Sequence, residues 1–184
     1  MNELKRGERG FSLIELLIVI ALTGIVTAAI TMTVFQVFNM NTRTSNRMAA
    51  VSQVQNAGKI VSEDILEAQN ITAAVGTGFP LSLNWTDPAS GNHTAVTYTL
   101  VSMPSMPPAG PQRLQRSVTV RPPGGPPATT VSIVAEYISV ASITPTQPCF
   151  FPNCSVRACN FTVTATVGKE SETRVYQVKP RPGS

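Results

Sequence analysis

The chain has 184 residues, of which 42% are hydrophobic and 13% charged, and its formal net charge is +4. Its basic residues are scattered, without the dense basic stripe and interleaved aromatic residues that bind a phosphate backbone, so no direct nucleic-acid site is evident. The single histidine, His93, sits in a turn-like segment and argues against Ser-His-Asp or Cys-His catalysis. About 100 residues follow the apolar and helical N-terminal part, which is enough for one compact domain.

A carboxylate interrupts the apolar stretch that follows a short charged leader. The leader, residues 1–10, ends at Gly10, and Glu15 lies five positions later in the run FSLIELLIVIALTGIV. An ionised side chain near the bilayer centre costs roughly 2.5–3.5 kcal/mol on insertion scales, so it usually has a partner. Cleavage after Gly10 would give Phe11 a new α-amino group that is largely protonated near neutral pH. Because four helical residues span only about 6 Å, Glu15 could pair with the Phe11 amine of a neighbouring subunit in a slightly shifted register.

The string GFSLIELLIVIALTGIV, within residues 10–38, closely resembles the class III leader and N-terminal helix of type IV pilins and of the pseudopilins of type II secretion and competence systems. The resemblance implies that a membrane-embedded prepilin peptidase cuts between Gly10 and Phe11 and methylates the amine of Phe11. It also implies that Glu15 is the assembly carboxylate. Short matches (WTD, VTYTL, LQRSV and VAEYIS) resemble the J-type minor pseudopilins and related minor pilins.

Two other interpretations of the N-terminus exist. A secretory signal could be cut near Thr27-Ala28-Ala29, but the apolar character continues to Phe38, which is too long for the apolar region of a signal peptide. A permanent single-pass anchor needs only about 20 apolar residues. Neither interpretation explains Glu15.

The first part of the chain is predicted to be one long helix, because no proline occurs before Pro80. Residues 11–38 form its transmembrane or filament-core half, and residues 39–75 form an amphipathic half. Apolar residues at helical spacing should face the outer domain. Three acidic residues, Glu63, Asp64 and Glu67, should lie on the solvent-exposed face of the helix. We expect the helix to stop at the Gly76-Thr77-Gly78 segment.

Residues 76–184 are predicted to form an antiparallel β domain. Alternation of apolar and polar residues predicts four strands, at Leu81–Thr86, 96–100, 114–120 and 161–167. Less regular runs at 131–143 and 174–178 add two more, which gives about six strands separated by proline-rich loops. Short connections favour a meander. The fold class is therefore α+β, with a long N-terminal helix packed on a C-terminal antiparallel sheet.

Three cysteines, Cys149, Cys154 and Cys159, lie five residues apart. Outside the cytoplasm such a cluster favours a disulfide, with one cysteine left over and the pairing open. Zinc normally takes four N or S ligands, so we expect no metal site, and we expect no cofactor. Five Asn-X-Ser/Thr triplets begin at Asn70, Asn84, Asn92, Asn153 and Asn160, and the sequence alone assigns no modification to them.

These features predict a non-enzymatic structural subunit, a minor pilin or pseudopilin of a filament that serves secretion, DNA uptake, adhesion or motility. The excess of Lys5, Arg6 and Arg9 in the leader predicts a cytoplasmic N-terminus and a C-terminal domain outside the cytoplasmic membrane, first in the membrane and then in a filament. Expected partners are other pilin or pseudopilin subunits, prepilin peptidase, the inner-membrane assembly platform and, before assembly, membrane lipid. The alternative is a membrane-anchored binding module that does not polymerise, with Trp85, Phe150 and Phe151 as candidate contacts.

Overall fold

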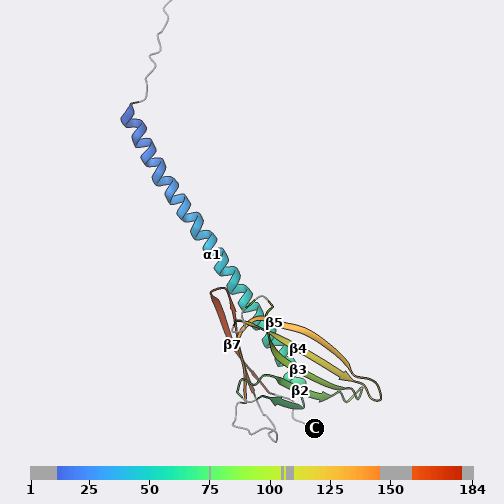
Figure 1. Cartoon of the computed structure of the whole chain (residues 1–184). Coiled ribbons are helices and arrows are strands. Elements are labelled where there is room, and N and C mark those ends of the chain that lie inside the picture. Colours follow the sequence, from blue (N-terminus) through green and yellow to red (C-terminus); the bar gives the residue numbers. More distant parts are fainter. Residues whose placement is uncertain (1–11, 75, 105, 107–109, 146–158, 180–184) are drawn as a thin grey trace, which may run out of the picture. The chain divides into compact units, whose positions relative to one another are not determined.

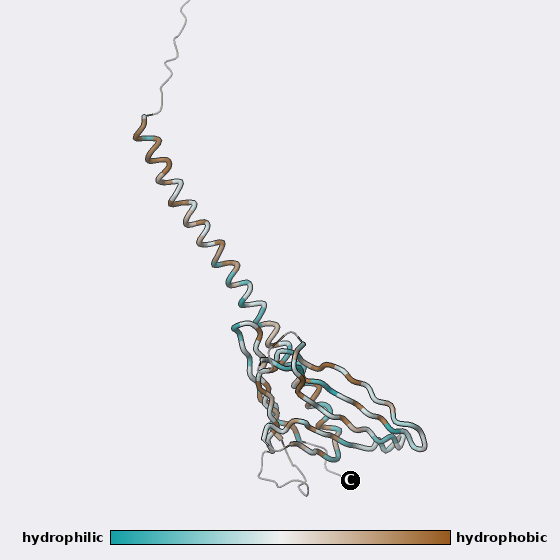
Figure 2. The backbone as a smooth tube through the Cα atoms, viewed as in Figure 1, coloured by the Kyte–Doolittle hydropathy of each residue, from teal (hydrophilic) through white to brown (hydrophobic). Residues whose placement is uncertain are grey.

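The computed structural model describes residues 12–74, 76–104, 106, 110–145 and 159–179. The chain divides into two compact units, residues 1–43 and residues 44–184. One helix, α1 (Leu13–Glu67), runs through the first unit and into the second. Every apolar side chain of its first half is exposed to the surroundings, and Figure 2 shows the change from apolar to mixed polar character along the helix.

The second unit contains seven antiparallel strands in simple sequence order (Figure 1). The strands are β1 (Asn70–Ala73), β2 (Leu81–Thr86), β3 (His93–Ser102), β4 (Gln112–Arg121), β5 (Ala128–Pro145), β6 (Cys159–Val167) and β7 (Glu170–Val178). The order confirms the predicted meander and the α+β fold class. The described residues thus hold one strand more than the six predicted, since β1 was assigned to the helix.

The prediction that the helix extends to residue 75 is wrong. It ends at Glu67, and β1 begins three residues later. The side chain of Gln69 explains why the helix ends early. Its amide oxygen accepts from the Thr86 N–H at 3.2 Å, and its amide nitrogen donates to the Thr86 carbonyl at 3.4 Å. Pairing with β2 therefore outweighs local helix propensity in this segment. Gly76 and Gly78 have positive φ and turn the chain from β1 to β2 instead of ending the helix.

β5 bends the sheet and joins its two halves. Its first part pairs with β4 and its second part with β6, and the register shifts on both sides of Ile138. Tyr137 has a φ of 59°, which is a left-handed conformation that a bulge can impose on a non-glycine residue. The Gln53 amide oxygen accepts the Glu136 backbone N–H at 2.8 Å, so α1 supports the bulge directly.

The core lies between the second half of α1 and one face of the sheet. The α1 residues that reach it include Val54, Val61 and Ile65, as the amphipathic pattern predicts, and also Ala50 and Ala57. They pack with strand residues such as Leu83, Val96, Leu114, Phe161 and Val163.

Helix and sheet lie close together at Gly58 of α1 and Tyr176 of β7. A Cβ atom built on Gly58 would overlap the ring of Tyr176, so only glycine fits here without a shift of the ring. The Tyr176 hydroxyl also donates to the Val54 carbonyl at 3.2 Å. The aromatic ring therefore lies directly against the helix backbone and fixes where β7 meets α1.

The prediction that Asp64 lies on the solvent-exposed face of the helix is wrong, because Asp64 is buried. Only 7% of Asp64 is exposed. The Arg116 guanidinium donates to both carboxylate oxygens, at 2.7 Å from Nε and 2.8 Å from Nη2, and the Tyr98 hydroxyl donates to one of them. A buried carboxylate is tolerated when its oxygens are satisfied in this way. Asp64, Tyr98 and Arg116, which we call the Asp64 cluster, tie the last turns of α1 to β3 and β4.

The Asp64 cluster changes the titration of both of its partners. Burial, together with the hydrogen bond to Asp64, raises the pKa of Tyr98 above its ordinary value of 10.0. The hydrogen bond to Asp64 raises the pKa of Arg116 against the opposing effect of burial. Both shifts favour the protonated forms that donate to the carboxylate.

Candidate functional site

Glu15 lies in the first turn of α1. Ser12 precedes the helix, and its carbonyl accepts the backbone N–H of Glu15 at 3.0 Å and that of Leu16 at 3.2 Å. The spacing Ser12-X-X-Glu15 is that of a capping box, and a carboxylate in the first turn is favoured by the helix dipole. The local sequence therefore starts the helix in a way that accepts an acidic residue at this point.

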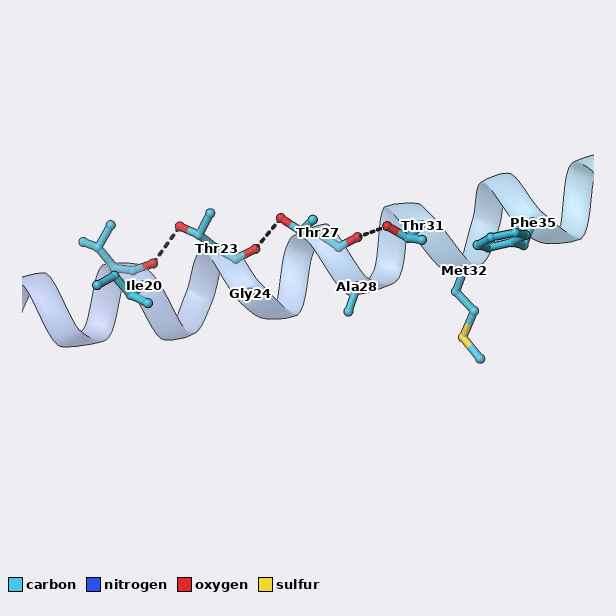
Figure 3. A pocket seen from close by; sticks show the side chains of 9 residues that line it. Ile20, Thr23, Gly24, Thr27, Ala28, Thr31, Met32 and Phe35 are labelled. Carbon is cyan, nitrogen blue, oxygen red and sulfur yellow. Dashed lines mark hydrogen bonds between the residues drawn. The ribbon is translucent and has the colours of Figure 1, made fainter.

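The other polar groups of the apolar half of α1 are largely satisfied within the helix. Each of Thr23, Thr27 and Thr31 donates its hydroxyl to the carbonyl four residues earlier, at 2.7–2.8 Å (Figure 3). Thr33 does the same to Ala29 at 2.9 Å. Such bonds remove most of the cost of placing a hydroxyl in hydrocarbon.

Glu15 has no such arrangement. It is the one ionisable side chain between Leu13 and Met40, and it makes no hydrogen bond or ion pair with any residue that the structure describes. Because an isolated carboxylate in an apolar medium is costly, Glu15 is the group in this segment that needs a partner from outside the helix.

A shallow groove runs along the same part of α1. It is lined by Gly24, Ala28 and the three threonines, together with larger apolar residues, Ile20, Met32 and Phe35 (Figure 3). A Cβ atom on Gly24 would meet no atom within 4 Å beyond the backbone of its own helix turns, so among the described residues no side chain packs against this glycine. Grooves with small residues allow a second helix to approach closely in an apolar environment. The i, i+4 spacing of Thr23, Thr27 and Thr31 could have revealed this face from the sequence.

The two residues at the predicted cleavage site, Gly10 and Phe11, lie outside the described residues. Cleavage between them and methylation of Phe11 therefore stay predictions. The same holds for the role of Glu15 as the assembly carboxylate, although its position at the start of α1 is now known.

Of the three cysteines, the structure describes Cys159 alone. It is the first residue of β6, it is buried and forms no disulfide with another described residue, and burial raises its pKa to about 11. Cys149 and Cys154 lie outside the described residues, so the disulfide stays a prediction. Among the described residues no group of three or more His, Cys, Asp or Glu side chains could hold a metal ion.

Of the remaining candidate residues, the structure describes His93 and Trp85. His93 is exposed at the first position of β3. Trp85 is partly buried and packs against the core, which weakens it as a ligand contact. Phe150 and Phe151 lie outside the described residues.

By length and composition, α1 is the one helix of the described residues that is able to cross a membrane. Among protein-family models, the prokaryotic N-terminal methylation motif matches residues 5–31. Comparison with curated proteins and with solved structures gave no match. The matched segment contains most of the leader, Glu15 and the first part of the groove.

Proposed function

The chain carries the N-terminal methylation motif of the type IV pilin and pseudopilin family, and on that premise we propose that it is a minor, J-type-like subunit of a pilus-like filament. In this proposal prepilin peptidase cuts after Gly10 and methylates the Phe11 amine. The processed subunit then enters a filament through the apolar half of α1. Other pilin subunits and the peptidase are the partners that the motif itself implies.

The observation that carries the proposal is the unpartnered carboxylate of Glu15. The threonine hydroxyls further along the same helix bond to its backbone carbonyls, whereas Glu15 has no internal donor among the described residues. Pairing with the Phe11 amine of a neighbouring subunit would neutralise two charges in an apolar surrounding, where an ion pair is far stronger than in water. The carboxylate thereby becomes an attachment point that sets the register between subunits.

Cohesion comes from helix packing. Apolar side chains of the first half of α1 are all exposed, which leaves a continuous surface for lipid before assembly and for other helices afterwards. Lipid tails are as apolar as these side chains, so van der Waals packing and close approach at Gly24 must supply the contact. Packing thus gives the filament its strength, and Glu15 gives it its alignment.

The topology follows from charge. Lys5, Arg6 and Arg9 of the leader favour a cytoplasmic N-terminus, which puts the β domain outside the cytoplasmic membrane. From there an inner-membrane assembly platform would draw the subunit into the filament. We propose a structural role without catalysis, in secretion, DNA uptake, adhesion or motility.

A Glu15→Ala variant tests the proposal. The substitution removes the insertion cost of roughly 2.5–3.5 kcal/mol, so the processed subunit should be at least as abundant in the membrane as the wild type. Its recovery in sheared or secreted filaments should fall strongly, because the partner amine stays uncompensated. Leu16→Ala is the matched control, since it shortens an exposed neighbour, 56% accessible, without touching the charge. Wild-type incorporation of Glu15→Ala would refute the pairing.

A further inference from the structure

The asparagines of this chain fall into two groups that differ sharply in their local sequence. None of the five asparagines up to Asn56 begins an Asn-X-Ser/Thr triplet, whereas all five from Asn70 onward do, and none of these triplets has proline in the middle. Fewer than a quarter of the residues from Gln69 onward are Ser or Thr, so chance alone would rarely produce five triplets from five asparagines. This triplet is the acceptor for asparagine-linked glycans.

Strand alternation accounts for part of this pattern. Residues i and i+2 share a face of a strand, so a polar residue is often followed by another at that spacing. Four of the triplets lie in the described β domain, and the structure separates them by access. Only the triplet at Asn70 has both its asparagine and its hydroxyl residue, Thr72, exposed.

The position of Asn70 in the sheet favours access to its side chain. β1 is the terminal strand of the described sheet, paired with β2 on one side only. Its backbone is extended, and the Asn70 and Thr72 side chains point to the same exposed face. Asn84, its cross-strand partner, lies between β1 and β3 and is half-buried.

The triplet at Asn160 provides a contrast within the same sheet. Asn160 is enclosed between Thr144 of β5 and Gln177 of β7, and both Asn160 and Thr162 are half-buried. An enzyme that must hold the asparagine amide and the hydroxyl together would find the Asn70 triplet exposed and the Asn160 triplet half-buried.

We propose that Asn70 is an N-glycosylation site, modified by a membrane-bound oligosaccharyltransferase that uses a lipid-linked glycan. The transfer forms a bond between the Asn70 amide nitrogen and the anomeric carbon of the glycan. The bond from that carbon to the polyprenyl diphosphate breaks, the lipid leaves as its diphosphate, and the amide nitrogen loses one proton to the enzyme. No oxidation or reduction is involved.

The glycan has a physical role at this place. A terminal strand presents unpaired N–H and C=O groups that can pair with a strand of another molecule, and proteins commonly shield such edges. A hydrophilic glycan on Asn70 covers the edge of β1 and opposes unwanted pairing between neighbouring β domains. The inference rests on the proposed placement of the β domain outside the cytoplasmic membrane.

Peptide mass spectrometry of the full-length protein from its native cells tests the proposal. The peptide containing Asn70 should carry a glycan mass that disappears in Asn70→Gln and in Thr72→Ala, and that persists in Thr72→Ser. Asn160→Gln is the matched control and should leave the glycan in place. An unmodified Asn70 peptide, or a glycan that survives Thr72→Ala, overturns the proposal. The N-terminal peptide in the same digest reports independently on cleavage at Phe11, so failure of the modification is distinguishable from failure of the proposed function.

Discussion

Replacing Asp64 with Asn should destabilise the β domain by about 3 kcal/mol. Removing one member of a buried ion pair typically costs about 3–5 kcal/mol, because the remaining charge is left buried without compensation. A quarter of the Arg116 side chain is exposed, so water can solvate part of the guanidinium, and the lower end of this range applies. The asparagine keeps the size of the side chain, so packing around α1 changes little.

A double replacement separates the loss of the pair from the burial of a lone charge. Asp64→Leu combined with Arg116→Met removes both charges and leaves the Tyr98 hydroxyl 3.4 Å from the Ile60 carbonyl as an alternative acceptor. Apolar substitutes for a buried ion pair are often neutral or stabilising, so the double variant should recover to within about 1 kcal/mol of the wild type.

The assay is chemical unfolding of the full-length protein in detergent, followed by near-ultraviolet circular dichroism of the aromatic residues. A loss below about 0.5 kcal/mol for Asp64→Asn would mean that the pair is effectively solvated, since changes of that size are typical of surface sites. A double variant less stable than Asp64→Asn would likewise refute the reasoning.

Three further predictions concern other parts of the chain. Gly58→Ala should destabilise the β domain by about 1–3 kcal/mol in the same unfolding assay, because its Cβ meets the Tyr176 ring, whereas Gly24→Ala, which meets no atom, should leave it unchanged. Because the pKa of Tyr98 is raised in the folded state, this hydroxyl ionises at a lower pH in the unfolded chain. The contribution of Tyr98 to the free energy of unfolding is therefore fully present below pH 10 and is lost as the pH rises above it. Measured over a pH series, the free energy of unfolding should fall less steeply for Tyr98→Phe than for the wild type. Gly10→Val should accumulate uncut precursor on immunoblots, and normal processing would count against the cleavage site.

Local patterns in the sequence predict most of the fold. Alternation predicted four strands, because strand residues such as Leu83, Val96 and Phe161 bury one side of the sheet in the core, and less regular runs predicted two more. β5 is the longest strand because it serves both halves of the sheet. β1 was missed because it is short and lies at the edge, and because its assignment depends on Gln69 bonding to β2 across the chain. No local propensity carries that information.

The Asp64 cluster shows a different reason for failure. Asp64 follows Val61 by three positions and precedes Ala68 by four, so it lies on the apolar face of the helix, and Arg116 shares the inward alternation of Leu114 and Val118. Opposite charges at two core-facing positions indicate a buried ion pair. This pair is missed when Asp64 is grouped with Glu63 and Glu67, its exposed neighbours. Glu15, by contrast, could be identified as a candidate site residue from the sequence, because it is a single carboxylate among apolar residues.

The N-terminus of the mature protein tests the central claim most directly. Intact-mass measurement of the protein recovered from native filaments should give a chain that begins at Phe11 and carries one added methyl group, with residues 1–10 absent. A mature chain that begins at Met1 would leave Glu15 without the amine proposed as its partner and would contradict the account.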